Sequence, residues 1–376
     1  MNIAVYIGHP SQYYFFKHPI KIWTKRGHRV QVLIRSKDIL EDLLIHDGVH
    51  YVNILPEGRN RGLIAIFYAL LKRIVRLYFQ MRHFHPDILI GSDASLPIVA
   101  RILQARCVTT LEDDYDVVKS LAMLTYPLTH VILTPFVCQV GRWEKKKVGY
   151  NGYMKLSALH PKRFSIDSQV ITSTVGDTPY CLVRLSALNA YHDKGVHGLS
   201  LEIVHRIISK CEEHGLKVWI NSETTLCAAS LPYQLRIHPA QLHHILAGAT
   251  LLISDSQSMS VEASVLGVPS IRYSDFAGKI SVLEELEHTY QLTKGVPTHS
   301  VELLLKHLDE WLSIDSLHDM FLSRKEKMLE DKMDVALFVA WFVEDYYVTH
   351  AMHDASNRFM LANQLSAIYS LKPEQF

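Results

Sequence analysis

The chain has 376 residues, of which 48% are hydrophobic and 20% are charged, and its formal net charge is +1. This length accommodates two domains, each with its own hydrophobic core. The near-neutral charge excludes the strongly basic face of a nucleic-acid-binding protein, so we expect no nucleic-acid partner. The five cysteines are widely spaced and include no Cys-x-x-Cys pair, which favours reduced thiols in a cytoplasmic protein.

The N-terminal residues, Met1 to Gly8, enter an apolar strand-like run directly, without a basic segment ahead of a long apolar one. This pattern predicts that no signal peptide is present. The sequence also has no stretch of roughly 18 uncharged apolar residues, the length that a membrane-spanning helix needs. We therefore expect a cytoplasmic location.

Short apolar segments rich in β-branched residues alternate with longer helical patterns along the chain. In the first half they predict strands near 3–7, 29–34, 50–54, 87–91, 107–111 and 130–133. In the second half they predict strands near 180–184, 216–220, 234–237, 250–253 and 268–271. Apolar spacings of three and four predict helices over 300–312, 317–329 and 333–347. This alternation is typical of an α/β fold with parallel sheets.

The stretch from Trp143 to Pro179 separates the two series of strands and contains a lysine run, glycine turns and a segment rich in Ser, Thr and Asp. We expect the domain junction there. The predicted domains are two Rossmann-like units over 1–150 and 151–330, followed by a polar tail over 348–376. Two such domains would place a cleft between the carboxyl ends of their sheets, where open α/β folds bind ligands.

The first predicted strand ends in Gly8-His9-Pro10-Ser11. A glycine at this place lets the backbone approach a ligand, and the His9 side chain would stand at the rim of the cleft. The pattern lacks the three glycines of a dinucleotide-binding fingerprint. A tight strand-to-helix turn with a capping serine explains the same residues, so both interpretations stay open.

Acidic residues follow two further strands of the first half. Asp93 comes after the strand over 87–91, and Glu112-Asp113-Asp114 follows the strand over 107–111. Carboxylates at neighbouring strand ends are candidates for the general base that deprotonates an acceptor hydroxyl. Any one of them could instead cap a helix, and the sequence does not decide which of Glu112, Asp113 and Asp114 matters.

In the second half, a predicted buried strand runs into the polar loop Ser254-Asp255-Ser256-Gln257-Ser258 and then into a helix that carries Glu262. Backbone N–H groups at a helix N-terminus form an anion site, and a carboxylate about one turn further along can accept hydrogen bonds from vicinal hydroxyls. Phosphate together with sugar hydroxyls suggests a nucleotide. The alternative is an ordinary N-capped helix in a parallel sheet.

Other candidate donor-binding residues follow the remaining strands of the second half: Arg184, His192, Ser222, Glu223 and His238. A cationic side chain that faces a phosphate stabilises a departing diphosphate. His243 and His244 lie on the next helix, although any one of the 22 histidines is more often a surface or core residue than a catalytic one. No histidine pair has acidic or cysteine partners at metal-binding spacing, so we expect no metal site.

Residues 59–82 form a basic segment with apolar residues at helical spacing. Such a helix can pack on a sheet while its basic edge meets anionic lipid headgroups, which would make the protein peripheral at the inner face of the cytoplasmic membrane. A core-packing amphipathic helix with solvated arginines explains the pattern equally well.

Several motifs together resemble the family labelled domain of unknown function 354, a group of GT-B-type proteins. They include Gly8-His9-Pro10, Lys25-Arg26-Gly27-His28, Tyr150-Asn151-Gly152-Tyr153, Ala190-Tyr191-His192-Asp193, Ser254-Asp255-Ser256, Gly267-Val268-Pro269 and Asp331-Lys332-Met333-Asp334-Val335. The resemblance covers most of the chain. It implies a GT-B-like fold whose C-terminal helices, residues 331–347, cross back to the N-terminal domain.

The segment from Asp255 to Ala263 is also similar to the Asp-Ser-Gly-Gly…Glu-Glu-Ala segment of non-hydrolysing nucleotide-sugar 2-epimerases. This similarity implies that Ser256, Gln257 and Ser258 hold the diphosphate and that Glu262 holds the ribose. It further implies that Asp93 and Glu112 correspond to strand-end carboxylates of those enzymes. Gln257 and Ser258 stand in place of the paired glycines, and Val261 in place of the first glutamate, which argues against epimerisation.

The sequence therefore predicts a metal-independent GT-B glycosyltransferase of cell-surface polysaccharide or glycolipid biosynthesis, with no cofactor. A nucleotide-sugar donor would bind through the second-half residues and Gly8, and a saccharide or lipid-linked acceptor would meet a base drawn from Asp93, Glu112 and His9. Two alternatives stay open: a nucleotide-sugar epimerase, and a non-catalytic protein that binds a nucleotide sugar.

Overall fold

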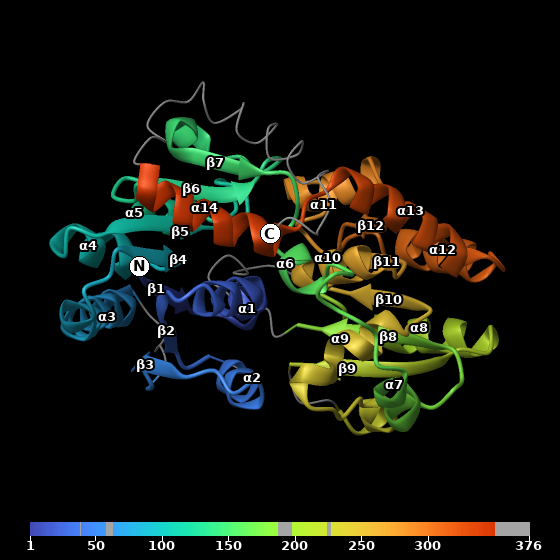
Figure 1. Cartoon of the computed structure of the whole chain (residues 1–376). Helices are drawn as coiled ribbons and strands as arrows, with labels where there is room; N and C mark the ends of the chain where they lie inside the picture. Colours follow the sequence, from blue (N-terminus) through green and yellow to red (C-terminus); the bar gives the residue numbers. More distant parts are fainter. Residues whose placement is uncertain (38, 58–62, 187–197, 224–226, 350–376) are drawn as a thin grey trace. The chain divides into compact units, whose positions relative to one another are not determined.

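The computed structural model describes residues 1–37, 39–57, 63–186, 198–223 and 227–349. The chain forms two compact units (Figure 1). The first contains Met1–Arg163 together with the chain from Lys332 onward, and the second contains Phe164–Asp331. Two chain crossings therefore connect the units.

The first unit is built on a seven-stranded parallel sheet with the order β3-β2-β1-β4-β5-β6-β7. Its strands are β1 (Asn2–Ile7), β2 (Arg29–Arg35), β3 (Tyr51–Leu55), β4 (Ile88–Gly91), β5 (Arg106–Thr110), β6 (Val131–Pro135) and β7 (Lys147–Tyr150). Its helices are α1 (Pro10–Lys25), α2 (Leu40–His46), α3 (Leu63–Phe84), α4 (Ser95–Ile102), α5 (Lys119–Thr125), η1 (Gly141–Lys146), α6 (Leu156–Leu159) and α14 (Val335–Thr349). The strand order reverses between β1 and β4.

The second unit is built on a five-stranded parallel sheet with the order β12-β11-β10-β8-β9. Its strands are β8 (Tyr180–Leu185), β9 (Lys217–Ser222), β10 (Leu251–Ser254), β11 (Ser270–Tyr273) and β12 (Thr293–Val296). Its helices are α7 (Ser168–Val175), α8 (Leu201–Glu213), η3 (Ala228–Tyr233), η4 (Pro239–Gln241), α9 (Leu242–Ala247), α10 (Gln257–Leu266), α11 (Ser281–His288), α12 (Val301–Leu312) and α13 (Leu317–Asp331). The strand order reverses between β8 and β10.

The last helix, α14, belongs to the first unit because it packs along α1 and α6. Trp23 Nε1 donates a hydrogen bond to the carbonyl oxygen of Ala340 at 3.1 Å, and His28 Nε2 lies 2.9 Å from a Glu344 carboxylate oxygen. Phe338 and Phe342 are buried beside these contacts. The α/β fold with two Rossmann-like sheets and a returning C-terminal helix, predicted from the sequence, is confirmed.

Helices α3 and α4 pack against each other and cover part of the first sheet. Buried Tyr6, Leu33 and Leu96 form one hydrophobic core there with Leu77 and Met81 of α3. This core fixes the strand ends that carry the candidate residues of the first unit.

Gly91 ends β4 with φ +151°, and a Cβ atom added there would lie 2.5 Å from the carbonyl oxygen of Tyr6. Only glycine allows this close approach between β1 and β4, at the point where the strand order reverses. The turn that follows carries Asp93, which lies just ahead of α4.

The strand predicted over 234–237 is wrong, because this segment forms only an isolated bridge between Gln234 and Ile220. Pro232 and Pro239 flank it, and proline restricts extension into a sheet ladder. The short edge strands β7 and β12 are additional to the predicted set. The first unit also continues past residue 150 to Arg163, because α6 packs on α1.

Candidate functional site

The loop Ser254–Ser258 joins β10 to α10 at the reversal point of the second sheet. Ser254 is the register partner of Arg184 on β8, so both residues end adjacent central strands. Ligands of open α/β sheets bind outside the carboxyl ends of the strands at such a reversal point. The sequence-predicted donor loop thus occupies the edge of the second unit that is best suited to a ligand.

Ser256 is the N-cap of α10. Its hydroxyl accepts a hydrogen bond from Met259 N at 3.4 Å, and Ser256 N donates to the Ser254 hydroxyl at 2.8 Å. The first N–H groups of a helix have no acceptor within the helix, and the helix dipole makes this end partly positive. The start of α10 can therefore hold an anion between Ser256 and the half-buried Ser258.

Glu262 lies one turn further along α10 and is 7% exposed. Its Oε1 accepts a hydrogen bond from the Ser258 hydroxyl at 3.0 Å, and its Oε2 lies 3.3 Å from His243 Nε2. His243 comes from α9 and is also buried. A carboxylate oxygen has more than one lone pair, so Glu262 keeps the capacity to accept from ribose hydroxyls.

Asp255 contacts the backbone on both sides of the segment 187–197, which lies outside the described residues. Its Oδ1 accepts from Ser186 N at 2.7 Å, and its Oδ2 accepts from Leu199 N at 3.3 Å. Burial raises the pKa of Asp255, while these N–H donors and Arg184 act in the opposite direction. The geometry gives Asp255 a role in holding the loop, and its contact with a donor stays a prediction.

Gln257, at the first position of α10, is fixed by two partners. Its Oε1 accepts from Arg272 Nη1 at 2.6 Å, and its Nε2 donates to the Ser274 hydroxyl at 2.6 Å. Arg272 on β11 is fully buried, and burial lowers its pKa to about 10 although Glu287 and Glu284 oppose this shift. The sequence analysis did not single out Arg272, since its partner Gln257 is distant in sequence.

Arg184 forms an ion pair with Glu223 and a hydrogen bond with the side-chain oxygen of Asn221. Both partners belong to the end of β9 or follow it directly. The structure thus brings Arg184 and Glu223 together. Arg184, which was predicted to face a phosphate, is paired with the Glu223 carboxylate instead. Ser222 is the last residue of β9, on the same edge.

His238 is an exposed N-cap: its Nδ1 accepts from Ala240 N at 3.3 Å, and the short helix η4 follows. His244 Nδ1 accepts from Asp167 N at 3.0 Å, so this histidine ties α9 to the start of α7. The predicted donor-binding residue His192 lies outside the described residues.

In the first unit, Gly8 and His9 follow β1 at the reversal point of the sheet. Gly8 N donates to Gln12 Oε1 at 2.8 Å, and Arg35 Nε donates to the Gly8 carbonyl oxygen at 3.2 Å. His9 is the N-cap of α1, and its Nδ1 accepts from Ser11 N at 3.2 Å and lies 2.8 Å from the Ser11 hydroxyl. His9 is thus a half-buried cap, and its position at the rim of a cleft stays a prediction.

Asp93 is 7% exposed, and a single carboxylate oxygen accepts three hydrogen bonds. The donors are Arg73 Nε at 3.2 Å, Ser95 N at 2.9 Å and the Ser95 hydroxyl at 2.6 Å. Arg73, which the sequence analysis did not select, is a buried residue of α3, and its buried Nη1 has no hydrogen-bond partner among the described residues. These contacts hold the Asp93 carboxylate between α3 and the start of α4.

Glu112 is half-buried after β5, and its Oε1 accepts from Met154 N at 2.6 Å. The carbonyl oxygen of Glu112 accepts from the Cys138 thiol at 2.8 Å. The nearby Asp114 is buried and accepts from Gln139 N at 2.7 Å. Both carboxylates therefore organise the backbone after β6, and a catalytic role for Glu112 stays a prediction.

Within the described ranges, no three His, Cys, Asp or Glu side chains gather as a metal site. In the same part of the chain, no helix is both long enough and apolar enough to cross a membrane.

Solved structures similar to this chain include both epimerases and glycosyltransferases. The S. aureus MnaA–UDP complex is 12% identical, with 92% of this chain and 96% of that chain covered and a TM-score of 0.67. UDP-GlcNAc 2-epimerase from Neisseria meningitidis bound to UDP-GlcNAc is 13% identical, with 93% and 99% covered and a TM-score of 0.60. Spinosyn forosaminyltransferase SpnP is 14% identical, with 92% and 99% covered and a TM-score of 0.59.

No protein-family model and no curated protein matches the chain, so the resemblance to domain of unknown function 354 is not confirmed. At 12–14% identity, the likeness to solved structures concerns the fold. The chain has the GT-B-like fold of two Rossmann-like units that these nucleotide-sugar epimerases and glycosyltransferases share.

Proposed function

We propose that this protein is a glycosyltransferase that takes a nucleotide-sugar donor and transfers the sugar to a saccharide or lipid-linked acceptor in cell-surface polysaccharide or glycolipid biosynthesis. The observation that carries the proposal is the arrangement at the start of α10. There, a serine-capped helix N-terminus follows a central strand at the reversal point of the second sheet, and the Glu262 carboxylate lies one turn further on.

The start of α10 suits the diphosphate of such a donor. Its N–H groups and the hydroxyls of Ser256 and Ser258 would bind the phosphate oxygens, and Glu262 would accept from the ribose hydroxyls. Negative charge builds up on the diphosphate as the sugar leaves. Fixed dipoles aimed at that charge stabilise the transition state and require no metal ion.

Each of the three predicted bases, His9, Asp93 and Glu112, already accepts a hydrogen bond from a backbone N–H, so we propose no single one of them as the base. Asp93 accepts three hydrogen bonds on one oxygen and pairs with Arg73. Glu112 accepts the Met154 N–H. His9 follows a central strand at the reversal point of the first sheet, and its Nδ1 accepts from Ser11 N, which places the proton of a neutral ring on Nε2.

The donor assignment is tested by a thermal-shift screen of UDP, GDP, CDP, ADP and dTDP on the wild type. The nucleotide that stabilises the wild type is then titrated by calorimetry into Glu262→Gln and into Glu302→Gln. Glu302 is a matched control, because it is an exposed glutamate of the same unit on α12, paired with Arg206. We expect binding to weaken roughly tenfold in Glu262→Gln, the loss of one hydrogen bond to a charged group, and to stay unchanged in the control.

The reaction is tested by NMR of the wild type with the corresponding nucleotide sugars in the absence of an acceptor. A glycosyltransferase leaves the sugar configuration intact and releases nucleotide only slowly to water. Conversion of a nucleotide sugar to its 2-epimer would contradict the proposal and would show that the protein is an epimerase. If none of the five nucleotides stabilises the wild type, the donor site at α10 is wrong.

A further inference from the structure

Helix α3 of the first unit presents large apolar side chains outward along one line. Phe67, Leu71, Val75 and Phe79, spaced four residues apart, are between 44% and 62% exposed. Side chains four apart stack along one face of a helix, so these four form a continuous stripe, which we call the α3 stripe. At 1.5 Å per residue the stripe is about 18 Å long.

The α3 stripe is distinct from the face that packs on the sheet. Leu77 and Met81 are fully buried in the core, with Ile74 and Tyr78 partly buried against it. The helix is therefore apolar on two faces, whereas a helix that only packs on a sheet has a polar outer face. Contiguous apolar surface of this kind marks an interaction site.

The charges beside the α3 stripe are predominantly positive. Helix α3 contains no acidic residue and carries Lys72, Arg76 and Arg82 on its outer side, while Arg73 is buried and pairs with Asp93. The Arg82 guanidinium lies 4.7 Å from the centre of the Phe79 ring, at the C-terminal end of the stripe. Lys72 and Arg76 flank its middle and share one carboxylate, that of Glu57.

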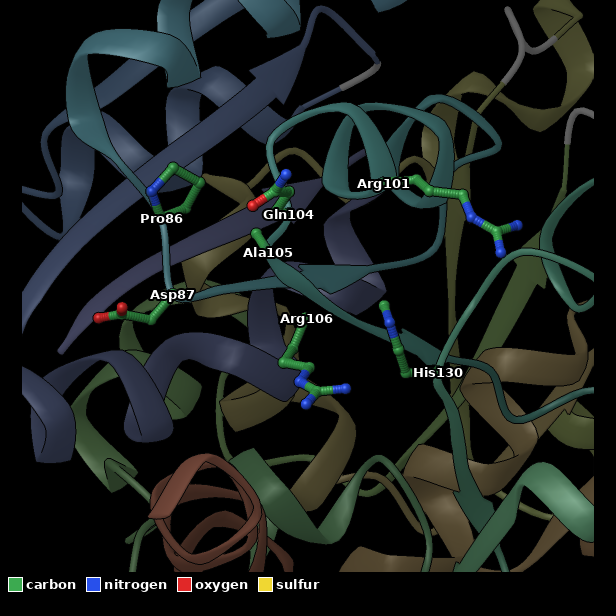
Figure 2. A pocket seen from close by; sticks show the side chains of 7 residues that line it. All are labelled: Pro86, Asp87, Arg101, Gln104, Ala105, Arg106 and His130. Atoms are coloured by element: carbon green, nitrogen blue, oxygen red, sulfur yellow. The ribbon is translucent and has the colours of Figure 1, made fainter. Parts of the chain in front are cut away.

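A cationic pocket of about 380 Å³ follows the C-terminal end of α3 (Figure 2). It is lined by Pro86 and Asp87, just beyond that helix, and by Arg101, Arg106 and His130. In the part of the chain that the structure describes, neither arginine side chain forms an ion pair or a hydrogen bond. Arg106 N donates to the Asp87 carbonyl oxygen at 2.9 Å, but the Asp87 carboxylate points away from the Arg106 guanidinium in Figure 2 and accepts from Asn2 N at 2.7 Å.

Lys146 adds a further positive charge near Arg101. Its ammonium group donates to the carbonyl oxygens of Tyr126, Pro127 and Thr129, which are uncharged and leave the positive charge of the region unchanged. His130 Nδ1 accepts from Cys107 N at 3.0 Å, which leaves the proton of a neutral ring on Nε2. Two guanidinium groups without carboxylate partners fit a phosphate group. The pocket lies by the amino ends of β4, β5 and β6, at the opposite edge of the sheet from His9 and Asp93.

We propose that the α3 stripe and this pocket form a docking surface for an anionic phospholipid bilayer. The stripe would lie in the interface with its side chains among the acyl chains, and the arginines would bind lipid phosphates. Charge complementarity favours a bilayer over a second copy of this chain, because a twofold contact through the stripe would bring the same cations together. The surface is separate from the proposed donor site, so either proposal can fail alone.

The test is co-sedimentation of the full chain with phosphatidylcholine vesicles and with vesicles of phosphatidylcholine and phosphatidylglycerol. The stripe variant is Phe67→Gln/Leu71→Gln/Val75→Gln/Phe79→Gln, and the pocket variant is Arg101→Gln/Arg106→Gln. The control, Met123→Gln/Leu124→Gln, removes two apolar residues of α5 in the same unit that are 55% and 53% exposed. Circular dichroism melting checks that all three variants fold.

We expect the wild type and the control to bind only the anionic vesicles, and more weakly as salt is raised. Each lost arginine should reduce the partitioning of the protein onto anionic vesicles roughly fivefold. Almost none of the stripe variant should sediment with the vesicles. Three results would overturn the proposal: no vesicle binding by the wild type, equal binding by the stripe variant, or a wild-type dimer in sedimentation velocity that the stripe variant dissociates. Stabilisation of the wild type by inorganic phosphate without vesicle binding would assign the pocket to a free anion and would also overturn it.

Discussion

His243 Nε2 lies 3.3 Å from Glu262 Oε2, and both side chains are buried between α9 and α10. The same carboxylate accepts from Ser258 through its other oxygen. A buried carboxylate needs such donors, because an unsatisfied charged group is costly inside a protein. The pair therefore holds Glu262 in the orientation that the proposed ribose contact requires.

We predict that His243→Leu and Glu262→Gln are coupled in stability. His243→Leu leaves the carboxylate with one donor fewer and should cost about 1–3 kcal/mol, whereas the same change in a Glu262→Gln background should cost less. Urea unfolding of the two single variants and the double variant measures the difference. Strictly additive effects would show that the two side chains do not interact.

A second prediction concerns Ser256, which caps α10. Ser256→Asp keeps a capping oxygen for Met259 N, so the unfolding free energy should stay within about 0.5 kcal/mol of the wild type. The new carboxylate would repel a diphosphate at the same helix end, and nucleotide binding should fall at least tenfold in calorimetry.

Ser200 provides the matched control for this charge. It caps α8 in the same unit by accepting from Ile203 N at 3.3 Å. Ser200→Asp should leave both stability and nucleotide binding unchanged. If Ser256→Asp binds nucleotide as tightly as the wild type, the anion does not sit at α10.

The strands with strong apolar patterns were predictable from the sequence, because each is buried in a parallel sheet and is rich in β-branched residues. β7 and β12 are four-residue edge strands that contain lysine and glycine, so their pattern does not differ from that of a loop. The segment 234–237 has a strand-like composition, yet it forms only one bridge. Whether such a segment joins a sheet depends on the strands that lie beside it in the fold, and the local sequence does not contain that information.

The same distinction applies to the candidate site. Ser256 and Glu262 lie on one continuous helix start, so their spacing alone predicts a cap with a carboxylate one turn later. Arg73 and Arg272 act on residues that are distant in sequence, Asp93 and Gln257. No local spacing reveals such partners, and only the fold brings them together.

A third prediction assigns Asp255 a role in holding the loop. Asp255→Asn replaces one accepting oxygen with a donor that faces the N–H group of Ser186 or Leu199. We expect a loss of about 1–3 kcal/mol in the unfolding free energy, measured in urea. Asp177→Asn is the control, since Asp177 contacts the exposed Thr172 on the surface of the same unit. An unchanged midpoint in Asp255→Asn would contradict this role.

A fourth prediction concerns acid stability through His18 on α1. Burial lowers the pKa of His18 to about 4, and Arg163, Lys21 and Lys17 act in the same direction, while Asp334 opposes them. The unfolded chain therefore binds the proton at a higher pH than the folded protein does. The contribution of His18 to stability is present above about pH 6.5 and is lost as the pH falls toward 4.

His18→Asn removes this titration. Because His18 is partly exposed, we expect the variant to lose about 1–2 kcal/mol less than the wild type between pH 7.5 and pH 4.5. Urea unfolding at the two pH values gives the comparison. His205→Asn makes the same substitution at an exposed position on α8, in the second unit, and is the matched control. Parallel pH profiles for His18→Asn and the wild type would mean that His18 is protonated equally in the folded and unfolded chains.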